Sequence, residues 1–154
     1  MPSASASAIG EQLHRFGLAR DRFRAAICRS TGLAERELDA LEYLERDGPL
    51  TQRELGERLS LTSGGVTLLI DRLERAGWVR RTPHPADRRA VLLELTEEAI
   101  RAQPPALDHY HRAVAAAARA IPPEHADAVA DFLANATAPA AEGAAVLRTS
   151  RAKP

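Results

Sequence analysis

Apolar residues recur at three- and four-residue steps along most of the chain, which is the spacing of amphipathic helices. This spacing predicts one helix over about residues 9–29, a second over 34–46 and a short third that ends near Leu59. A further helix is expected from Ser63 to Arg75, where four apolar residues fall on one face: Val66, Leu69, Ile70 and Leu73. The chain is therefore expected to be mainly helical.

Two of these helices have recognisable starts. Thr51 and Glu54 have capping-box spacing, in which the Thr51 hydroxyl can accept from the Glu54 amide and the Glu54 carboxylate can accept from the Thr51 amide. Thr62 can cap the helix that begins at Ser63, after a turn at Ser60 and Leu61. Two short helices joined by a tight turn form a helix-turn-helix.

After Gly77 the periodicity changes from helical to alternating. Residues 78–82 and 90–95 are expected to pair as two strands, because apolar and polar positions alternate in the second. The connector between them, 83–87, contains two prolines and an aspartate, which are turn residues. The helix-turn-helix is thus followed by a hairpin, or wing, with Arg88 and Arg89 at its tip.

Proline-rich stops divide the remaining chain. Gln103-Pro104-Pro105 should break the helix that follows Thr96, because proline lacks an amide donor and disfavours helical geometry in the residue before it. Helices are expected again over 106–120 and 124–136. Residues 138–154 are expected to be a mobile tail or at most a short helix, and 1–8 to be disordered. The sequence predicts a winged helix-turn-helix domain at 33–100 between helical segments at 9–32 and 101–137.

Charge and cysteine content narrow the function classes. The 154-residue chain has a formal net charge of zero, but arginines outnumber acidic residues between positions 72 and 89. A basic module within a neutral chain permits phosphate binding. Cys28 is the only cysteine, so no intrachain disulfide can form, and no apolar run approaches the roughly 20 residues of a membrane span. We expect a cytoplasmic protein.

Three segments resemble the MarR family of winged helix-turn-helix transcriptional regulators: LTQRELGERL, SLTSGGVTLLIDRLERAGWVRR and DRRAVLLELT. The resemblance is strong over about residues 33–100. It implies a homodimeric regulator, held together by dimerisation helices at 9–32 and 101–137, that binds a pseudo-palindromic double-stranded DNA operator. We expect it to be a repressor. The family usually has an unbroken long helix where this chain has Pro104 and Pro105.

The resemblance and the chemistry of the residues together nominate a DNA interface. The candidate residues are Ser63, Gly64, Gly65, Thr67, Leu68, Arg72, Arg75, Arg88 and Arg89. The two glycines would let backbone amides at the helix start approach phosphate, and Thr67 can contact a base edge. Leu68 departs from the polar or basic residue that the family often has there, and suits a thymine methyl group.

The arginines are expected to act in two ways. Arg72 and Arg75 are candidates for phosphate contacts, although Arg75 could instead pair with Asp71 one turn away. Arg89, with Arg88, is placed to enter a minor groove. Asp87 is expected to orient Arg89 rather than to contact DNA.

Several alternatives remain open. The resemblance implies a small-molecule effector, often aromatic or phenolic, with Phe16, Phe23 and Tyr43 as apolar pocket candidates. Cys28 could be an oxidant-sensing thiol instead, or the winged module could bind proteins and not DNA. The sequence contains no combination of residues typical of catalysis, so we expect no enzymatic activity, no cofactor and no metal.

Overall fold

The computed structural model describes residues 4–87 and 89–151. Arg88, one of the predicted wing residues, lies outside the described residues. The chain divides into two units, the first ending at Pro104 and the second beginning at Pro105. Each unit is described by itself below.

The first unit begins with two helices, α1 (Ala4–Thr31) and α2 (Glu35–Asp47). They are linked by Arg24, whose guanidinium lies 2.5 Å from the Asp39 carboxylate and also pairs with Glu42. The predicted disorder of residues 1–8 is wrong for 4–8, because α1 begins at Ala4. The alternating alanines there have the highest helix propensity of any residue, which favours continuation of the helix.

The helix-turn-helix follows as α3 (Gln52–Leu59) and α4 (Ser63–Arg75). Both predicted caps are confirmed: the Thr51 hydroxyl accepts from the Glu54 amide at 3.2 Å and the Thr62 hydroxyl from the Gly65 amide at 3.2 Å. Ser60, in the turn between the helices, has a φ of 53°, in the left-handed region. This conformation reverses the chain and lets the two helices cross closely.

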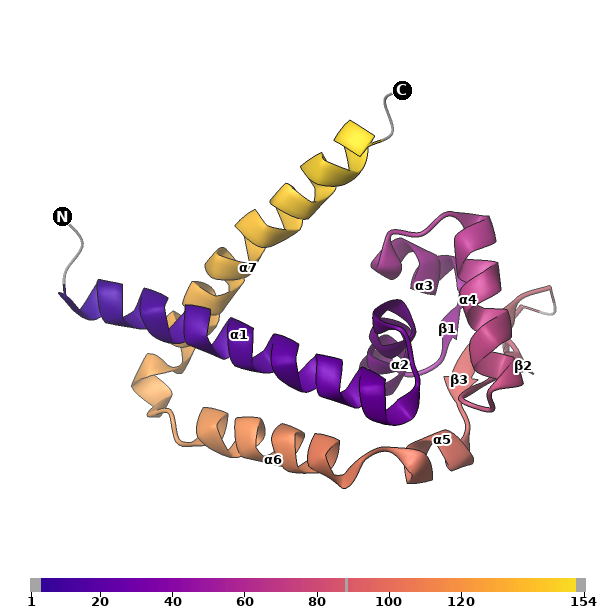
Figure 1. Ribbon diagram of the computed structural model, residues 1–154, viewed down its shortest axis with the longest axis horizontal. Coiled ribbons are helices and arrows are strands. Elements are labelled where there is room, and N and C mark those ends of the chain that lie inside the picture. The colour runs from indigo at the N-terminus through magenta and orange to yellow at the C-terminus, as the bar shows by residue number, and fades with distance from the viewer. Residues whose placement is uncertain (1–3, 88, 152–154) are drawn as a thin grey trace. The chain divides into compact units, whose positions relative to one another are not determined.

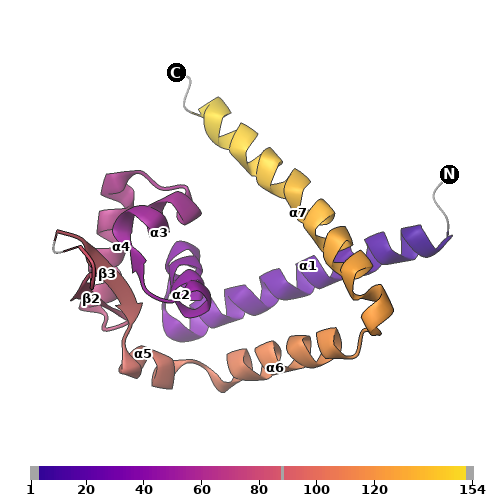
Figure 2. The same ribbon diagram turned by 180° about the vertical axis from the view of Figure 1, so that it is seen from behind.

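The wing is part of a three-stranded antiparallel sheet. The strands β2 (Val79–Pro83) and β3 (Val91–Leu95) form the predicted hairpin, with Val79 opposite Leu95. The sequence did not predict β1 (Leu50–Thr51), which pairs with the other edge of β3 to give the order β1-β3-β2. A two-residue strand leaves too short an alternation to detect. In Figures 1 and 2 the strands lie beside α4.

One hydrophobic core holds α2, the helix-turn-helix and the sheet together. Its most deeply buried large side chains are Leu55, Leu59, Val66, Ile70, Leu73, Val79 and Leu93. The apolar face predicted for α4 is entirely within this core, because Leu69 is buried as well. The inner face of α4 is thus fixed by packing, which leaves its other face available to a partner.

The first unit ends with α5 (Glu97–Ala102), which Thr96 caps by accepting from the Ala99 amide at 3.0 Å. The predicted break at Gln103-Pro104-Pro105 is confirmed, since the next helix starts at Pro105.

The second unit consists of α6 (Pro105–Arg119) and α7 (Pro123–Arg151). The mobile tail predicted for 138–154 is wrong over 138–151, because α7 continues through Pro139 to Arg151. Pro139 removes one backbone hydrogen bond from this helix, and its neighbours are mostly alanines, the residues with the highest helix propensity.

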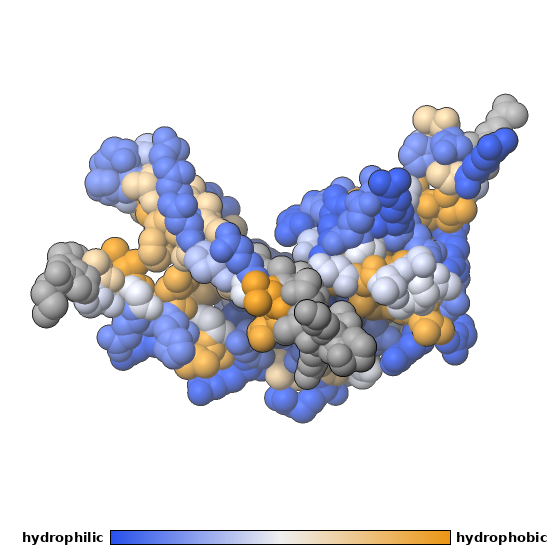
Figure 3. All heavy atoms as spheres, turned by 90° about the horizontal axis from the view of Figure 1, so that it is seen from above, coloured by the Kyte–Doolittle hydropathy of each residue, from blue (hydrophilic) through white to orange (hydrophobic). Residues whose placement is uncertain are grey.

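Among the described residues, no helix combines the length and the apolar character that a membrane span requires. Figure 3 shows apolar surface (orange) exposed at several places among hydrophilic (blue) surface. Contiguous apolar surface of this kind usually marks a site for a binding partner.

Candidate nucleic-acid interface

The N-terminal half of α4 presents its outer face to solvent. Ser63 and Gly64 are exposed, and a Cβ added at Gly64 would meet nothing within 4 Å. Leu68, one turn further along, is 68% exposed. An exposed leucine beside a bare helix start gives a low, partly apolar surface of the kind that can approach base edges and thymine methyl groups.

Gly65 does not form the bare surface that was predicted for both glycines. It is half-buried, and its amide donates to the Thr62 hydroxyl that caps the helix. A Cβ added at Gly65 would lie 3.3 Å from that hydroxyl oxygen. Gly65 therefore makes room for the cap, whereas Gly64 alone provides the bare surface.

Thr67 is held by the neighbouring helix. Its hydroxyl donates to the Ser63 carbonyl at 2.8 Å and accepts from the Gln52 side-chain amide, at the start of α3, at 2.6 Å. Both bonds use the oxygen that was predicted to contact a base. Gln52 was not among the predicted site residues, since the sequence alone does not show that these two positions meet.

Arg72 extends from α4 to the start of α2. Its Nε lies 3.0 Å from Oε1 of Glu37, the only charged residue among the described ones that is buried. The other carboxylate oxygen of Glu37 accepts from the Ala34 amide at 2.8 Å. Glu37 thus joins the first turn of α2 to α4, and Arg72 holds one end of that connection while its side chain stays 61% exposed.

The alternative pairing of Arg75 with the Asp71 carboxylate does not form. The Asp71 carboxylate instead lies 2.8 Å from the guanidinium of Arg81 on β2, and Arg81 also pairs with Glu74. The Nε of Arg75 donates to the Asp71 carbonyl at 3.0 Å. The Asp71 carboxylate therefore pairs with an arginine of the wing strand, and Arg75 contacts only the Asp71 carbonyl.

The wing tip is organised by two side chains. The Asp87 carboxylate accepts from the Arg89 amide at 2.9 Å, so it fixes the backbone at Arg89. His84 Nδ1 accepts from the amides of Ala86 and Asp87, each at 3.1 Å. The Arg89 side chain is exposed and belongs to none of the ion pairs found among the described residues.

Comparisons with known proteins identify this arrangement. The sequence profile of the MarR family matches residues 31–90, which include the helix-turn-helix and most of the hairpin. The winged module at residues 31–90 belongs to the MarR family.

Curated relatives of the family match this module. An uncharacterised helix-turn-helix transcriptional regulator of Bacillus subtilis, YcgE, is 42% identical over 71 residues, which are 46% of each chain. The transcriptional repressor MdtR of the same organism is 37% identical over 67 residues, 44% of this chain and 43% of that one. The chain thus spans about half the length of the curated relatives that it matches. These relatives are transcriptional regulators and not enzymes.

The fold extends further than the sequence match. The crystal structure of the transcriptional regulator Tm0710 from Thermotoga maritima aligns with a TM-score of 0.62 over 96% of this chain and 99% of the other. At 23% identity this likeness concerns the fold alone. The predicted fold class is confirmed.

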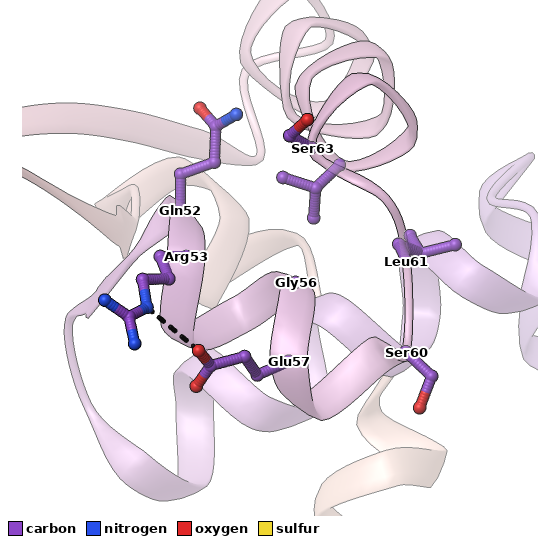
Figure 4. A pocket seen from close by; sticks show the side chains of 8 residues that line it. Gln52, Arg53, Gly56, Glu57, Ser60, Leu61 and Ser63 are labelled. Atoms are coloured by element: carbon purple, nitrogen blue, oxygen red, sulfur yellow. Dashed lines mark hydrogen bonds and ion pairs between the residues drawn. The ribbon is translucent and has the colours of Figure 1, made fainter.

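An open pocket of about 400 Å³ lies between the two helices of the MarR-family module. In Figure 4, Gln52 and Ser63 stand next to each other along one rim, and the pair between Arg53 and Glu57 stands on another. The Arg53 Nε to Glu57 Oε1 distance is 2.9 Å, and both side chains are mostly exposed. The pocket brings the start of α3 and the start of α4 onto one surface.

A second pocket, of about 370 Å³, adjoins the pair between Glu37 and Arg72. It is also lined by Leu33, Arg75 and Trp78 and by the last residue of α1. The three predicted pocket candidates are not among the residues that line it: Phe16 is 48% exposed, and Tyr43 packs on the core with Arg46 5.0 Å from its ring centroid. Phe23 is half-buried on α1.

Cys28 is half-buried on α1. Burial raises the pKa of its thiol above the ordinary value, and the acidic side chains of Glu35 and Asp39 raise it further against the lowering effect of Arg24. A raised pKa keeps the reactive thiolate scarce at neutral pH. This environment does not favour an oxidant-sensing role.

Proposed function

We propose that this chain is a DNA-binding transcriptional regulator that acts in the cytoplasm. The observation that carries the proposal is the split character of α4, whose inner face is wholly buried while its N-terminal outer face is bare and exposed. A helix held in this way can enter the major groove with its first residues at the base edges. The names of the curated relatives, which are regulators and repressors, support the same assignment.

The interface divides into base contacts and backbone contacts. Ser63, Gly64, Thr67 and Leu68 face the groove, and the amides at the start of α4 add the positive end of the helix dipole. Arg89 enters the minor groove from the wing, with its backbone held by Asp87. Arg75 is the phosphate contact of α4. Gly65 and Arg72 act through the geometry of the helix.

We propose that two copies of the chain form the functional dimer. In the second unit, Leu107 is the only buried residue among positions 105–140. Helices gain most of their stability from tertiary packing, so α6 and α7 need a partner surface. Exposed apolar side chains on these helices supply one: Val114, Phe132 and Leu133. A second copy would present the same residues and form a symmetric interface.

We propose repression released by a small anionic aromatic molecule. The pocket beside Glu37 and Arg72 combines the Trp78 ring and Leu33 with two guanidinium groups. A ligand carboxylate there would compete with Glu37 for Arg72 and so loosen the connection between α2 and α4. By linkage, operator DNA would then weaken ligand binding by the same factor. The test is a titration with a phenolic acid at fixed DNA concentration.

The experiment that tests DNA binding is a titration with duplex DNA at two salt concentrations, after selection of bound fragments from a random pool. The proposal requires an enriched half-site repeated at about one helical turn and an affinity that falls with salt. Light scattering should give the mass of two chains. If neither enrichment nor salt-sensitive binding appears, the module serves protein interaction instead and the proposal is wrong.

A further inference from the structure

Gln52 occupies the first position of α3, and its side chain reaches across to α4. The side-chain amide nitrogen lies 2.6 Å from the Thr67 hydroxyl oxygen, and the two residues are 15 positions apart in the chain. Both side chains are half-buried, and Gln52 also lines the pocket between the helices. Figure 4 shows Gln52 on the same rim as Ser63, the residue whose carbonyl Thr67 also contacts.

These two bonds fix the hydrogen-bonding character of Thr67. A hydroxyl has one proton and two acceptor positions. The proton goes to the Ser63 carbonyl at 2.8 Å, so the Gln52 amide must be the donor in the other bond and occupies one acceptor position. One acceptor position remains, and Thr67 has no proton left for a partner outside the protein.

We propose that Gln52 is a positioning residue that sets base preference through Thr67. The inference rests on the proposed DNA-binding function. In the major groove, adenine and cytosine present amino donors, whereas guanine O6 and thymine O4 are acceptors. A Thr67 that can only accept favours adenine or cytosine on the strand that it faces. Without Gln52, only the bond to the Ser63 carbonyl orients the Thr67 hydroxyl. The hydroxyl can then rotate and donate its proton to an acceptor on a base instead.

The bond between Gln52 and Thr67 is not needed to hold the helices together. The contact between α3 and α4 is already made in the core by Leu55, Leu59 and Val66, each at most 2% exposed. Gln52 therefore adds little packing, and its main effect is on the Thr67 oxygen. Arg53, the next residue, serves as a matched control because it is exposed on the same helix and pairs with Glu57.

The test is selection from random duplex DNA with the full-length chain, followed by measured affinities for single-base variants of the best site. The wild type should prefer adenine or cytosine at one position of each half-site by about tenfold. Gln52→Met, which lacks the donor, should reduce this preference to less than about threefold, with little change at other positions. Gln52→Ala serves if the methionine variant does not fold, and Arg53→Ala should keep the preference.

Variants of Thr67 show whether Gln52 acts through it. Thr67→Ser keeps the hydroxyl and should keep the preference, whereas Thr67→Val should lose it. Adding Gln52→Met to Thr67→Val should change the base profile no further. The inference is overturned if Gln52→Met leaves the base preference unchanged. It is also overturned if the double variant differs in base preference from Thr67→Val alone. In both cases the proposed DNA binding still stands. A wild type that binds no duplex overturns both the inference and the proposed function.

Discussion

The pair between Arg72 and Glu37 can be tested by a double-mutant cycle that combines Arg72→Ala with Glu37→Gln. Arg72→Ala leaves the Glu37 carboxylate, whose side chain is 8% exposed, with one backbone donor. Glu37→Gln keeps an oxygen for the Ala34 amide and removes the charge. The cost of losing Arg72 should therefore be smaller in the Glu37→Gln background.

The magnitude follows from the unequal burial of the partners. An exposed pair is worth about 0.2–1 kcal/mol, and removing one partner of a fully buried pair costs about 3–5 kcal/mol. Arg72 is 61% exposed and Glu37 almost buried, at a separation of 3.0 Å. We expect Arg72→Ala to destabilise the protein by about 1–3 kcal/mol, and a coupling of about 1–2 kcal/mol between the two sites.

Urea denaturation of the four proteins at one fixed protein concentration measures the coupling, because a dimer's stability depends on concentration. The salt dependence of DNA binding supplies the second measurement. Arg72→Ala should leave the salt slope nearly unchanged, whereas loss of a phosphate contact would reduce it by about 1 per subunit. A coupling below about 0.3 kcal/mol together with that reduced slope would refute the structural role of Arg72.

Further variants test the wing and the cap of α3. Arg89→Ala should weaken operator binding by about 1–3 kcal/mol with an unchanged melting temperature; an effect on melting alone would contradict groove contact. His84→Ala should weaken DNA binding by about 1 kcal/mol through the lost acceptor for two wing amides, and His84→Asn, which can accept from the same amides, should retain binding. Thr51→Ala should cost about 0.5–2 kcal/mol in urea denaturation. Hydrogen bonds from the Thr51 hydroxyl and amide lower the pKa of the Glu54 carboxyl. The stability that these bonds contribute is fully present above the ordinary carboxyl pKa and is lost as the pH falls through the lower pKa of the folded state. Glu54→Gln should remove this pH dependence of stability.

The sequence was sufficient wherever structure follows from short-range spacing. The helix from Ser63 to Arg75 was predicted to the residue, because its apolar face and its Thr62 cap are both local features. The capping box at Thr51 was predicted for the same reason. The break before Pro105 follows from proline chemistry, which needs no tertiary context.

The errors arose where distant residues compete for the same group. The spacing of Asp71 and Arg75 left an ion pair within the helix open as an alternative, but Arg81 on the wing strand binds the Asp71 carboxylate. The contact of Gln52 with Thr67 spans 15 residues and was not predicted. No periodicity in the sequence shows which of several nearby charges or amides will meet once the chain folds. Side-chain partners at the interface therefore required the structure.

These competing contacts change what the arginine-rich segment can do. Arg72 pairs with Glu37, Arg80 with Glu94, and Arg81 with Asp71 and Glu74. The Arg72 and Arg80 pairs are neutral, and the group of Arg81 with two carboxylates carries one net negative charge, so the segment offers phosphate less positive charge than its composition indicates. Arg75 and Arg89 are in no ion pair among the described residues, and they remain for direct contact.

A chain with zero net charge and mostly paired arginines gains little from non-specific attraction to the DNA backbone. Its affinity for arbitrary duplex should therefore be low, and discrimination must come from the fit of the α4 surface to its bases. This makes small polar groups decisive. If the proposed function holds, the orientation of one threonine hydroxyl, held by one glutamine, should affect the choice of site more than another unpaired cation would.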